Sequence, residues 1–216
     1  MSPASLQDLQ SVPFNLGSPI KDQVRESVEL SLKHFKTNPQ VDSYLDVVLL
    51  HSFLPSGEET LQAWQALEEF VPTHVKAIGV SNITVEQLEV LWRFAVVKPS
   101  IVQNRFYRRN GYDGALRRFC KSHGIKYQAY WVLKKNADLL LSHPVCELSR
   151  LAGLSREASL FFLLADLEIA VLDGTTQIVR MHANQKDLEW ARKWSRQSTT
   201  EKNWTSLQHA FSSILE

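Results

Sequence analysis

The sequence predicts an α/β fold in which parallel strands alternate with helices, and two features carry that prediction. Short apolar runs rich in Val and Leu, such as residues 44–51, are too short for a helix and suit strands buried on both faces of a parallel sheet. These runs alternate with segments of helical periodicity, the first at residues 22–35, where apolar side chains recur from Val24 to Phe35. Such alternation implies right-handed crossovers, in either an open sheet or a barrel.

Five strands and the helices between them can be placed along the chain. The strands are predicted at residues 44–51, 75–80, 101–103, 127–131 and 169–172. The helices are predicted at residues 22–35, 58–70, 84–94, 113–123, 144–151 and 156–164, and a further helix begins within 179–194. A complete barrel of this kind has about eight strands, so we expect a chain with about five parallel strands to form an incomplete one.

Polar residues at the strand ends favour the barrel over the open sheet. No Gly-x-Gly-x-x-Gly segment follows any of the predicted strands, which counts against a dinucleotide-binding open sheet. The polar residues that follow successive strands are His51, Ser81 with Asn82, Gln103 with Asn104, Tyr130 with Trp131, and residues 174–176. A (β/α) TIM-type barrel gathers its functional residues at this face, so the fold class we predict is an incomplete barrel of that type.

Three regions are expected along the chain. Residues 1–20 contain Pro3, Pro13, Gly17 and Pro19 and no apolar period, so they are predicted to form an irregular arm. Residues 21–195 are predicted to form the partial barrel, and residues 196–216 a C-terminal helical tail.

Composition excludes several classes of function. The 216 residues carry a net charge of +1, with 24 basic and 23 acidic side chains, so no electrostatic field favours nucleic acid or an anionic membrane. No signal peptide or membrane-spanning stretch is recognisable, which predicts a cytoplasmic protein. Cys120 and Cys146 lack the spacing of a metal site or a disulfide framework, so we expect no metal and two buried thiols.

Several strand-end segments together resemble the aldo-keto reductase family. The segments are Tyr-Leu-Asp-Val-Val-Leu-Leu-His at 44–51, Ile-Gly-Val-Ser-Asn at 78–82, Val-Gln-Asn at 102–104, Gln-Ala-Tyr-Trp at 128–131 and Leu-Asp-Gly-Thr-Thr at 172–176. Each is weak alone, but they stand in the family's order from about residue 22 to residue 184. The resemblance implies an NADP(H)-dependent carbonyl or alcohol oxidoreductase.

The resemblance also implies roles for individual residues. His51 matches the histidine that orients the carbonyl of the substrate. Ser81, Asn82 and Gln103 match residues that hydrogen-bond the nicotinamide carboxamide, and Tyr130 matches the tyrosine that stacks on the nicotinamide ring. The residues that match those at the adenosine 2′-phosphate and adenine are Thr175, Arg180 and Asn184. Gly174 stands where many members carry a lysine, and Asp173 adds negative charge, which puts the affinity for NADP(H) in question.

The tyrosine, lysine and aspartate of the family's catalytic set have no match in this chain, because they belong to barrel strands that precede its first predicted strand. Loss of general acid catalysis alone costs roughly 10²- to 10⁴-fold in rate, so reductase activity is expected to be weak or divergent. Two alternatives remain. The pocket could perform a redox-neutral cyclisation, isomerisation or dehydration with His51 as acid or base, or the chain could be a non-catalytic relic that acts as a partner.

Simpler structural roles remain open for two of these matches. His51 ends an apolar strand and could be a core-edge histidine that bonds a backbone carbonyl. Ser81 and Asn82 could merely shape a turn and cap the helix that begins near Thr84. The strand at 44–51 would also leave an open barrel edge, which we expect the 1–20 arm, a second copy of the chain or another protein to cover.

Overall fold

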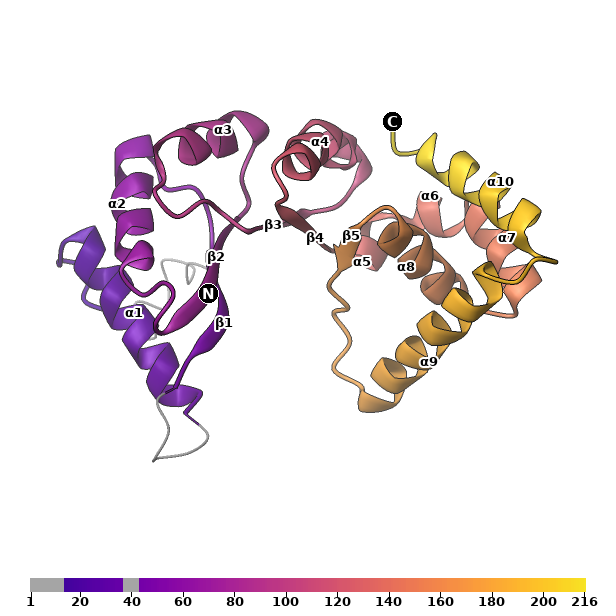
Figure 1. Cartoon of the computed structure of the whole chain (residues 1–216), viewed down its shortest axis with the longest axis horizontal. Helices are drawn as coiled ribbons and strands as arrows, with labels where there is room; N and C mark the ends of the chain where they lie inside the picture. The colour runs from indigo at the N-terminus through magenta and orange to yellow at the C-terminus, as the bar shows by residue number, and fades with distance from the viewer. Residues whose placement is uncertain (1–13, 37–42) are drawn as a thin grey trace. The chain divides into compact units, whose positions relative to one another are not determined.

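The computed structural model describes residues 14–36 and 43–216 and has the predicted parallel α/β architecture (Figure 1). The five strands are β1 (Leu45–Leu50), β2 (Val75–Ser81), β3 (Ile101–Arg105), β4 (Lys126–Tyr130) and β5 (Ile169–Val171), and they follow one another in the sheet in chain order. The pairs β1–β2, β2–β3 and β4–β5 are parallel. The prediction of five parallel strands is therefore confirmed.

Ten helices lie before, between and after these strands in the described part of the chain. They are α1 (Ile20–His34), α2 (Gly57–Glu68), α3 (Val85–Phe94), α4 (Gly114–Ser122), α5 (Val132–Lys135), α6 (Ala137–Leu140), α7 (His143–Ala152), α8 (Arg156–Asp166), α9 (Ile178–Ser195) and α10 (Glu201–Ser212), with the 3-10 helix η2 (Arg108–Asp113) before α4. The short helices α5 and α6 were not predicted. The predicted helical tail contains α10.

The chain divides into two compact units, which are described separately. The first holds residues up to Gln103 together with Phe119–Ile125, and the second holds Asn104–Arg118 and Lys126–Glu216. The predicted region boundaries at residues 20 and 195 stay a prediction. Most of the predicted arm, residues 1–13, lies outside the described residues, and α1 begins at Ile20, directly after Pro19.

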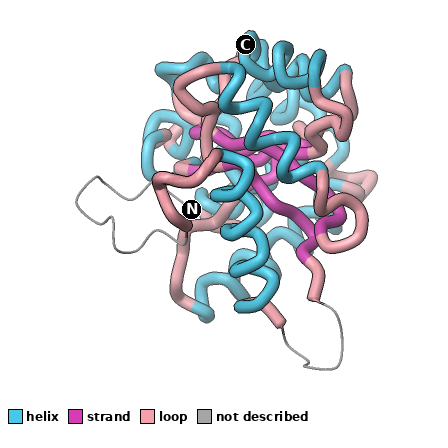
Figure 2. Tube along the Cα trace, turned by 90° about the vertical axis from the view of Figure 1, so that its left-hand side faces the viewer, coloured by secondary structure: helices cyan, strands magenta, loops and turns pink. Residues whose placement is uncertain are grey.

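The core of the first unit forms where α1 and α2 pack together beside the strands. Viewed from the side of these two helices, Figure 2 shows helices in front of strands. Val28 of α1, Trp64 of α2 and Ile78 of β2 are buried, and the indole Nε1 of Trp64 donates a hydrogen bond to the carbonyl oxygen of Val97 at 3.0 Å. The outer strand β1 is less covered, since Val47 remains 41% exposed. What covers this strand stays a prediction.

Both helices that follow β1 and β2 begin with a capping box. Ser56 accepts a hydrogen bond from the amide of Glu59 while the Glu59 carboxylate accepts one from the amide of Ser56, and Thr84 and Gln87 repeat the arrangement at α3. These reciprocal bonds satisfy amide groups that a helix start otherwise leaves unpaired. They explain why each strand turns into a helix at these positions.

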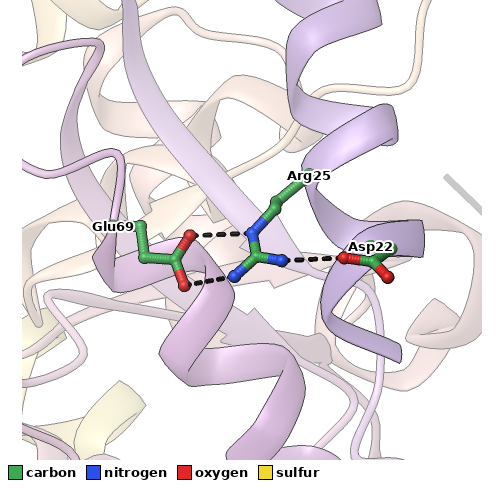
Figure 3. A network of polar contacts seen from close by, with 3 residues as sticks. All are labelled: Asp22, Arg25 and Glu69. Carbon is green, nitrogen blue, oxygen red and sulfur yellow. Dashed lines mark hydrogen bonds and ion pairs between the residues drawn. The ribbon is translucent and has the colours of Figure 1, made fainter. Parts of the chain in front are cut away.

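An ion-pair network joins α1 to the end of α2 (Figure 3). The guanidinium of Arg25 donates two hydrogen bonds to the carboxylate of Glu69, from Nε at 2.8 Å and from Nη2 at 2.7 Å. Its Nη1 donates to Asp22 at 2.7 Å. Such two-point contact between Arg and a carboxylate is the strongest geometry available to an exposed ion pair.

We expect the replacement Glu69→Gln to lower the melting temperature at pH 7 and to have no effect in acid. The hydrogen bond from Arg25 lowers the pKa of Glu69 below its ordinary 4.5. A carboxyl group whose pKa is lower when folded stabilises the fold above the unfolded pKa, and this contribution is lost as pH falls through the folded value. The difference between parent and variant, measured by circular dichroism, should therefore shrink as pH falls from about 4.5 through the lower folded-state pKa of Glu69.

The matched control for this pair is Glu29→Gln on the exposed side of α1, which makes the same change in charge. It should leave the melting temperature nearly constant across the same pH range. High salt should also reduce the effect of Glu69→Gln, because exposed ion pairs are screened. A Glu69→Gln effect that persists unchanged at pH 3 would contradict the assignment.

In the second unit the core lies among α7, α8 and α10. Leu148 of α7, Leu160 of α8 and Phe211 of α10 are buried, and the rings of Phe162 and Trp204 lie 4.9 Å apart. The longest helix, α9, is attached through Trp190, whose indole Nε1 donates to the carbonyl oxygen of Ala152 at 2.8 Å. The first turns of α9, by contrast, are exposed.

Candidate functional site

The ends of β2 and β3 meet in the first unit through a shared carbonyl group. Ser81 lies opposite Gln103 in the parallel register. The hydroxyl of Ser81 donates to the carbonyl oxygen of Gln103 at 2.6 Å, and the backbone amide of Asn82 donates to the same oxygen at 3.1 Å. Because Ser81 is buried, its hydroxyl is held in one orientation.

Asn82 links this pair to the end of β1. Its backbone φ is 54°, in the left-handed region that Asn tolerates better than most residues. Its side-chain Nδ2 donates to the carbonyl oxygen of His51 at 2.9 Å and to the hydroxyl of Ser81 at 3.2 Å. Thr84, and neither Ser81 nor Asn82, caps the start of α3, while the alternative that the pair only shapes the turn before this helix stays a prediction.

His51 follows β1 and is partly buried. Its Nδ1 is buried and has no hydrogen-bond partner among residues 14–36 and 43–216. Burial lowers the pKa of His51 below its ordinary 6.5, so the imidazole is neutral at pH 7. A neutral imidazole offers one N–H donor and one acceptor nitrogen. The alternative that His51 is a core-edge histidine bonded to a backbone carbonyl stays a prediction, since the structure settles only the state of Nδ1 among the described residues.

Tyr130 ends β4 in the second unit, where it contacts a basic residue. Its hydroxyl accepts a hydrogen bond from Nε of Arg105 at 3.0 Å. The next residue, Trp131, has φ of 63° and leaves the strand, so β4 stops one residue earlier than predicted. The guanidinium of Arg105 lies 4.5 Å from the centre of the Trp131 ring.

The segment predicted to bind the nucleotide phosphate precedes α9 in the same unit, and it is held by an acidic residue. One carboxylate oxygen of Asp173 accepts from the backbone amide of Thr175 at 3.0 Å, and the other accepts from Nδ2 of Asn184 at 2.6 Å. Arg180 is exposed and makes no ion pair with any residue that the structure describes. As they stand, these residues do not fit a 2′-phosphate, because a carboxylate already accepts from two of the expected donors.

A polar cluster around Asp113 in the second unit was missed by the sequence analysis. The carboxylate of Asp113 accepts from the hydroxyl of Tyr127 at 2.7 Å, from Nδ2 of Asn104 at 2.9 Å and from Nδ2 of Asn110 at 2.8 Å. Burial raises the pKa of Asp113. The sequence feature that could have indicated this cluster is the turn-forming segment Asn-Gly-Tyr-Asp at residues 110–113.

The predicted residues thus fall into two sets. His51, Ser81, Asn82 and Gln103 are joined by hydrogen bonds in the first unit. The others, Tyr130, Thr175, Arg180 and Asn184, belong to the second unit, where they occur at the end of β4, in the loop before α9 and in α9 itself.

The described residues contain no group of three His, Cys, Asp or Glu side chains that could hold a metal ion. The side chain of Cys120 is buried, whereas that of Cys146 is only partly buried. Within the same two ranges, 14–36 and 43–216, no helix has the length and apolar character needed to cross a membrane.

Comparison with known proteins identifies relatives that match about half of the chain. Glyoxal reductase of Bacillus subtilis is 34% identical over 111 residues, which is 51% of this chain and 39% of the relative. An NAD/NADP-dependent indole-3-acetaldehyde reductase of Schizosaccharomyces pombe is 33% identical over 115 residues, 50% of this chain and 38% of the relative. The matches thus span well under half the length of these two relatives.

The fold is shared with solved structures over a longer range. An aldo-keto reductase from a Medee basin deep-sea metagenome library superimposes with a TM-score of 0.67 at 23% identity, covering 83% of this chain and 68% of the solved chain. This likeness supports the predicted partial (β/α) barrel. The model of the aldo/keto reductase family matches residues 15–138, which is more than half of the sequence. The chain belongs to the aldo/keto reductase family.

Proposed function

We propose that the chain binds a nicotinamide dinucleotide and a small carbonyl or alcohol substrate, as an oxidoreductase with weak turnover on its own. The observation that carries the proposal is the buried Nδ1 of the neutral His51, which has no hydrogen-bond partner in the described part of the chain. A desolvated imidazole at a strand end, with hydrogen-bonding capacity left over, is suited to orient a polar substrate atom.

The hydrogen bonds of Ser81 favour a carboxamide as its ligand. A hydroxyl has one proton and two acceptor positions. Its proton is donated to Gln103 and one acceptor position is used by Asn82. The remaining acceptor position suits the amide N–H of a nicotinamide, which is the role that the family resemblance assigns to Ser81, Asn82 and Gln103. For Tyr130 the proposed role is stacking on the nicotinamide ring.

The proposed chemistry is hydride transfer to a carbonyl carbon, in which a bound reduced nicotinamide would supply the hydride and solvent water would supply the proton that the resulting alkoxide takes up. The chain's own contribution is to hold the carbonyl oxygen against His51 and to exclude water around Ser81, which is buried. The proposal includes the expectation that these 216 residues lack a counterpart of the family's catalytic tyrosine, lysine and aspartate. Because general acid catalysis contributes roughly 10²- to 10⁴-fold, we expect turnover by this chain alone to be slow.

A redox-neutral reaction is the second candidate, and the same nitrogen of His51 favours it. A neutral imidazole can take a proton from one substrate atom and return it to another, as cyclisation, isomerisation or dehydration of a carbonyl compound requires. That reaction would depend on His51 without consuming cofactor. A third possibility is a non-catalytic role as a partner, in which neither turnover nor dependence on His51 is expected.

We expect His51→Ala to reduce carbonyl turnover by roughly 10²-fold while changing dinucleotide affinity less than about threefold, since the proposed ligand of His51 is the substrate. Binding is measured by the change in NADH and NADPH fluorescence on titration with the chain. Turnover is measured with a small aldehyde, both by loss of reduced cofactor and by product analysis. His51→Gln, which keeps hydrogen bonding but cannot titrate, should fall between parent and His51→Ala.

The control is His34→Gln at the exposed end of α1, which should match the parent in both assays. Parent-like turnover in His51→Ala would remove the role of His51. Absence of saturable binding by either dinucleotide would end the oxidoreductase proposal. A product that forms without cofactor and requires His51 would establish the redox-neutral alternative.

A further inference from the structure

We propose that Asp173 makes this chain select NAD(H) over NADP(H) at the adenosine end of the cofactor. The proposal rests on the proposed dinucleotide binding and specifies one residue that decides which dinucleotide is bound. It concerns only the loop before α9 and the first turns of that helix, which all belong to the second unit.

The carboxylate of Asp173 already uses donors that a phosphate would need. The backbone amide of Thr175 and the side-chain amide of Asn184 both donate to it, at 3.0 and 2.6 Å. A phosphate group could reach the same two donors only by displacing the carboxylate. The carboxylate of Asp173 therefore accepts the hydrogen bonds that a bound phosphate would otherwise accept.

The negative charge of Asp173 also disfavours a bound 2′-phosphate. A 2′-phosphate would bring roughly two negative charges close to the exposed carboxylate of Asp173, and like charges about 4 Å apart near a protein surface weaken binding by about tenfold or more. The neighbouring Gly174 carries no positive charge that could offset this repulsion, and no atom beyond its chain neighbours lies within 4 Å of the position of a Cβ at this glycine. Arg180 is the basic residue in this segment that could offset the repulsion.

A ribose 2′-hydroxyl, unlike a 2′-phosphate, can bind next to the carboxylate of Asp173. An ionised carboxylate has about four acceptor positions, of which Asp173 uses one on each oxygen. It can accept a further hydrogen bond from a 2′-hydroxyl while it keeps both bonds to the loop. Acceptance of the 2′-hydroxyl by an acidic side chain is a general means by which proteins prefer NAD over NADP.

The experiment compares four ligands and five forms of the 216-residue chain. NADH and NADPH are titrated by fluorescence, and 5′-AMP and 2′,5′-ADP are titrated by calorimetry to isolate the adenosine end. The forms are the parent, Asp173→Asn, Asp173→Ser, the double variant Asp173→Asn with Arg180→Ala, and the control Glu189→Gln. Glu189 is exposed on α9 and lies about 13 Å along the helix from Arg180, so it repeats the change in charge away from the loop.

The parent should bind NADH about 10-fold more tightly than NADPH, and 5′-AMP more tightly than 2′,5′-ADP. Asp173→Asn and Asp173→Ser should each shift the NADH-to-NADPH affinity ratio toward NADPH by about 10- to 100-fold, and Glu189→Gln should leave it unchanged. Adding Arg180→Ala to Asp173→Asn should abolish the gain in NADPH affinity, because Arg180 is then the charge that attracts the phosphate.

Two results would overturn the inference while the proposed function stands: a parent that binds NADPH as tightly as NADH, or Asp173 variants whose affinity ratio matches that of the parent. If no form of the chain binds either dinucleotide, the proposed function fails together with the inference. Circular dichroism of each variant checks that its fold is intact, and agreement between the Asn and Ser variants checks that lost charge, not altered shape, causes the shift.

Discussion

The replacement Gly79→Ala is expected to destabilise the first unit by about 3 kcal/mol or more, because the sheet has no room for a side chain at this position. A Cβ atom on Gly79 would lie 2.3 Å from the carbonyl oxygen of Ile101 and 2.6 Å from Cδ2 of Leu49. The first of these atoms belongs to the backbone of β3, which cannot rotate away. Relief requires β2 and β3 to separate.

Separation of these strands would also disturb the candidate site. Gly79 pairs with Ile101 in the same ladder in which Ser81 pairs with Gln103. We therefore expect loss of dinucleotide binding together with the loss of stability, measured by urea denaturation and by cofactor fluorescence. The control is Gly57→Ala in α2, where the nearest atom is Phe53 Cζ at 4.0 Å.

Gly57→Ala should be neutral or stabilising by up to about 1 kcal/mol, because alanine restricts the unfolded chain at a position it can occupy. Equal stability of Gly79→Ala and Gly57→Ala would show that the close approach of β2 and β3 does not exist in solution.

The replacement Asp113→Ala is expected to cost the second unit about 3 kcal/mol, because it leaves three hydrogen-bond donors without their acceptor. The donors are the hydroxyl of Tyr127 and the side-chain amides of Asn104 and Asn110. The backbone adds to the loss, since Asp113 has φ of 53° and alanine is strained there. The loss is measured as a lower urea midpoint with an unchanged slope.

Asp113→Asn separates charge from backbone strain, because Asn tolerates the same conformation. Burial raises the pKa of Asp113 above its ordinary 3.8, so the folded chain binds this proton more tightly than the unfolded chain does. The stability of the parent relative to Asp113→Asn should therefore fall as pH rises from about 3.8 through the folded-state pKa, and then stay constant.

The exposed Asp138 serves as the control for this series. Its carboxylate lies 3.4 Å from the hydroxyl of Tyr112 and makes a long contact with Arg108, so Asp138→Asn should change stability by less than about 0.5 kcal/mol. A parent stability that rises with pH relative to Asp113→Asn would show that burial is not the dominant influence on this carboxyl.

Much of the fold was predictable because it depends on local patterns. Short apolar runs predicted the strands, and periodic apolar residues predicted α1. The pairs Ser56 with Glu59 and Thr84 with Gln87 form capping boxes within single turns. The strand-end residues His51, Ser81 and Gln103 were also predictable, since the carboxyl ends of parallel strands share an edge.

The sequence by itself determined the order of strands and helices, the family and the residue types at the strand ends. Only the tertiary structure decided the hydrogen-bond partners of these residues. Ser81 donates to Gln103, His51 Nδ1 lacks a partner among the described residues, and Asp173 accepts from Asn184. Hydrogen bonds and close approaches of this kind join atoms many residues apart, and their distances follow from how whole elements pack, which no local pattern encodes.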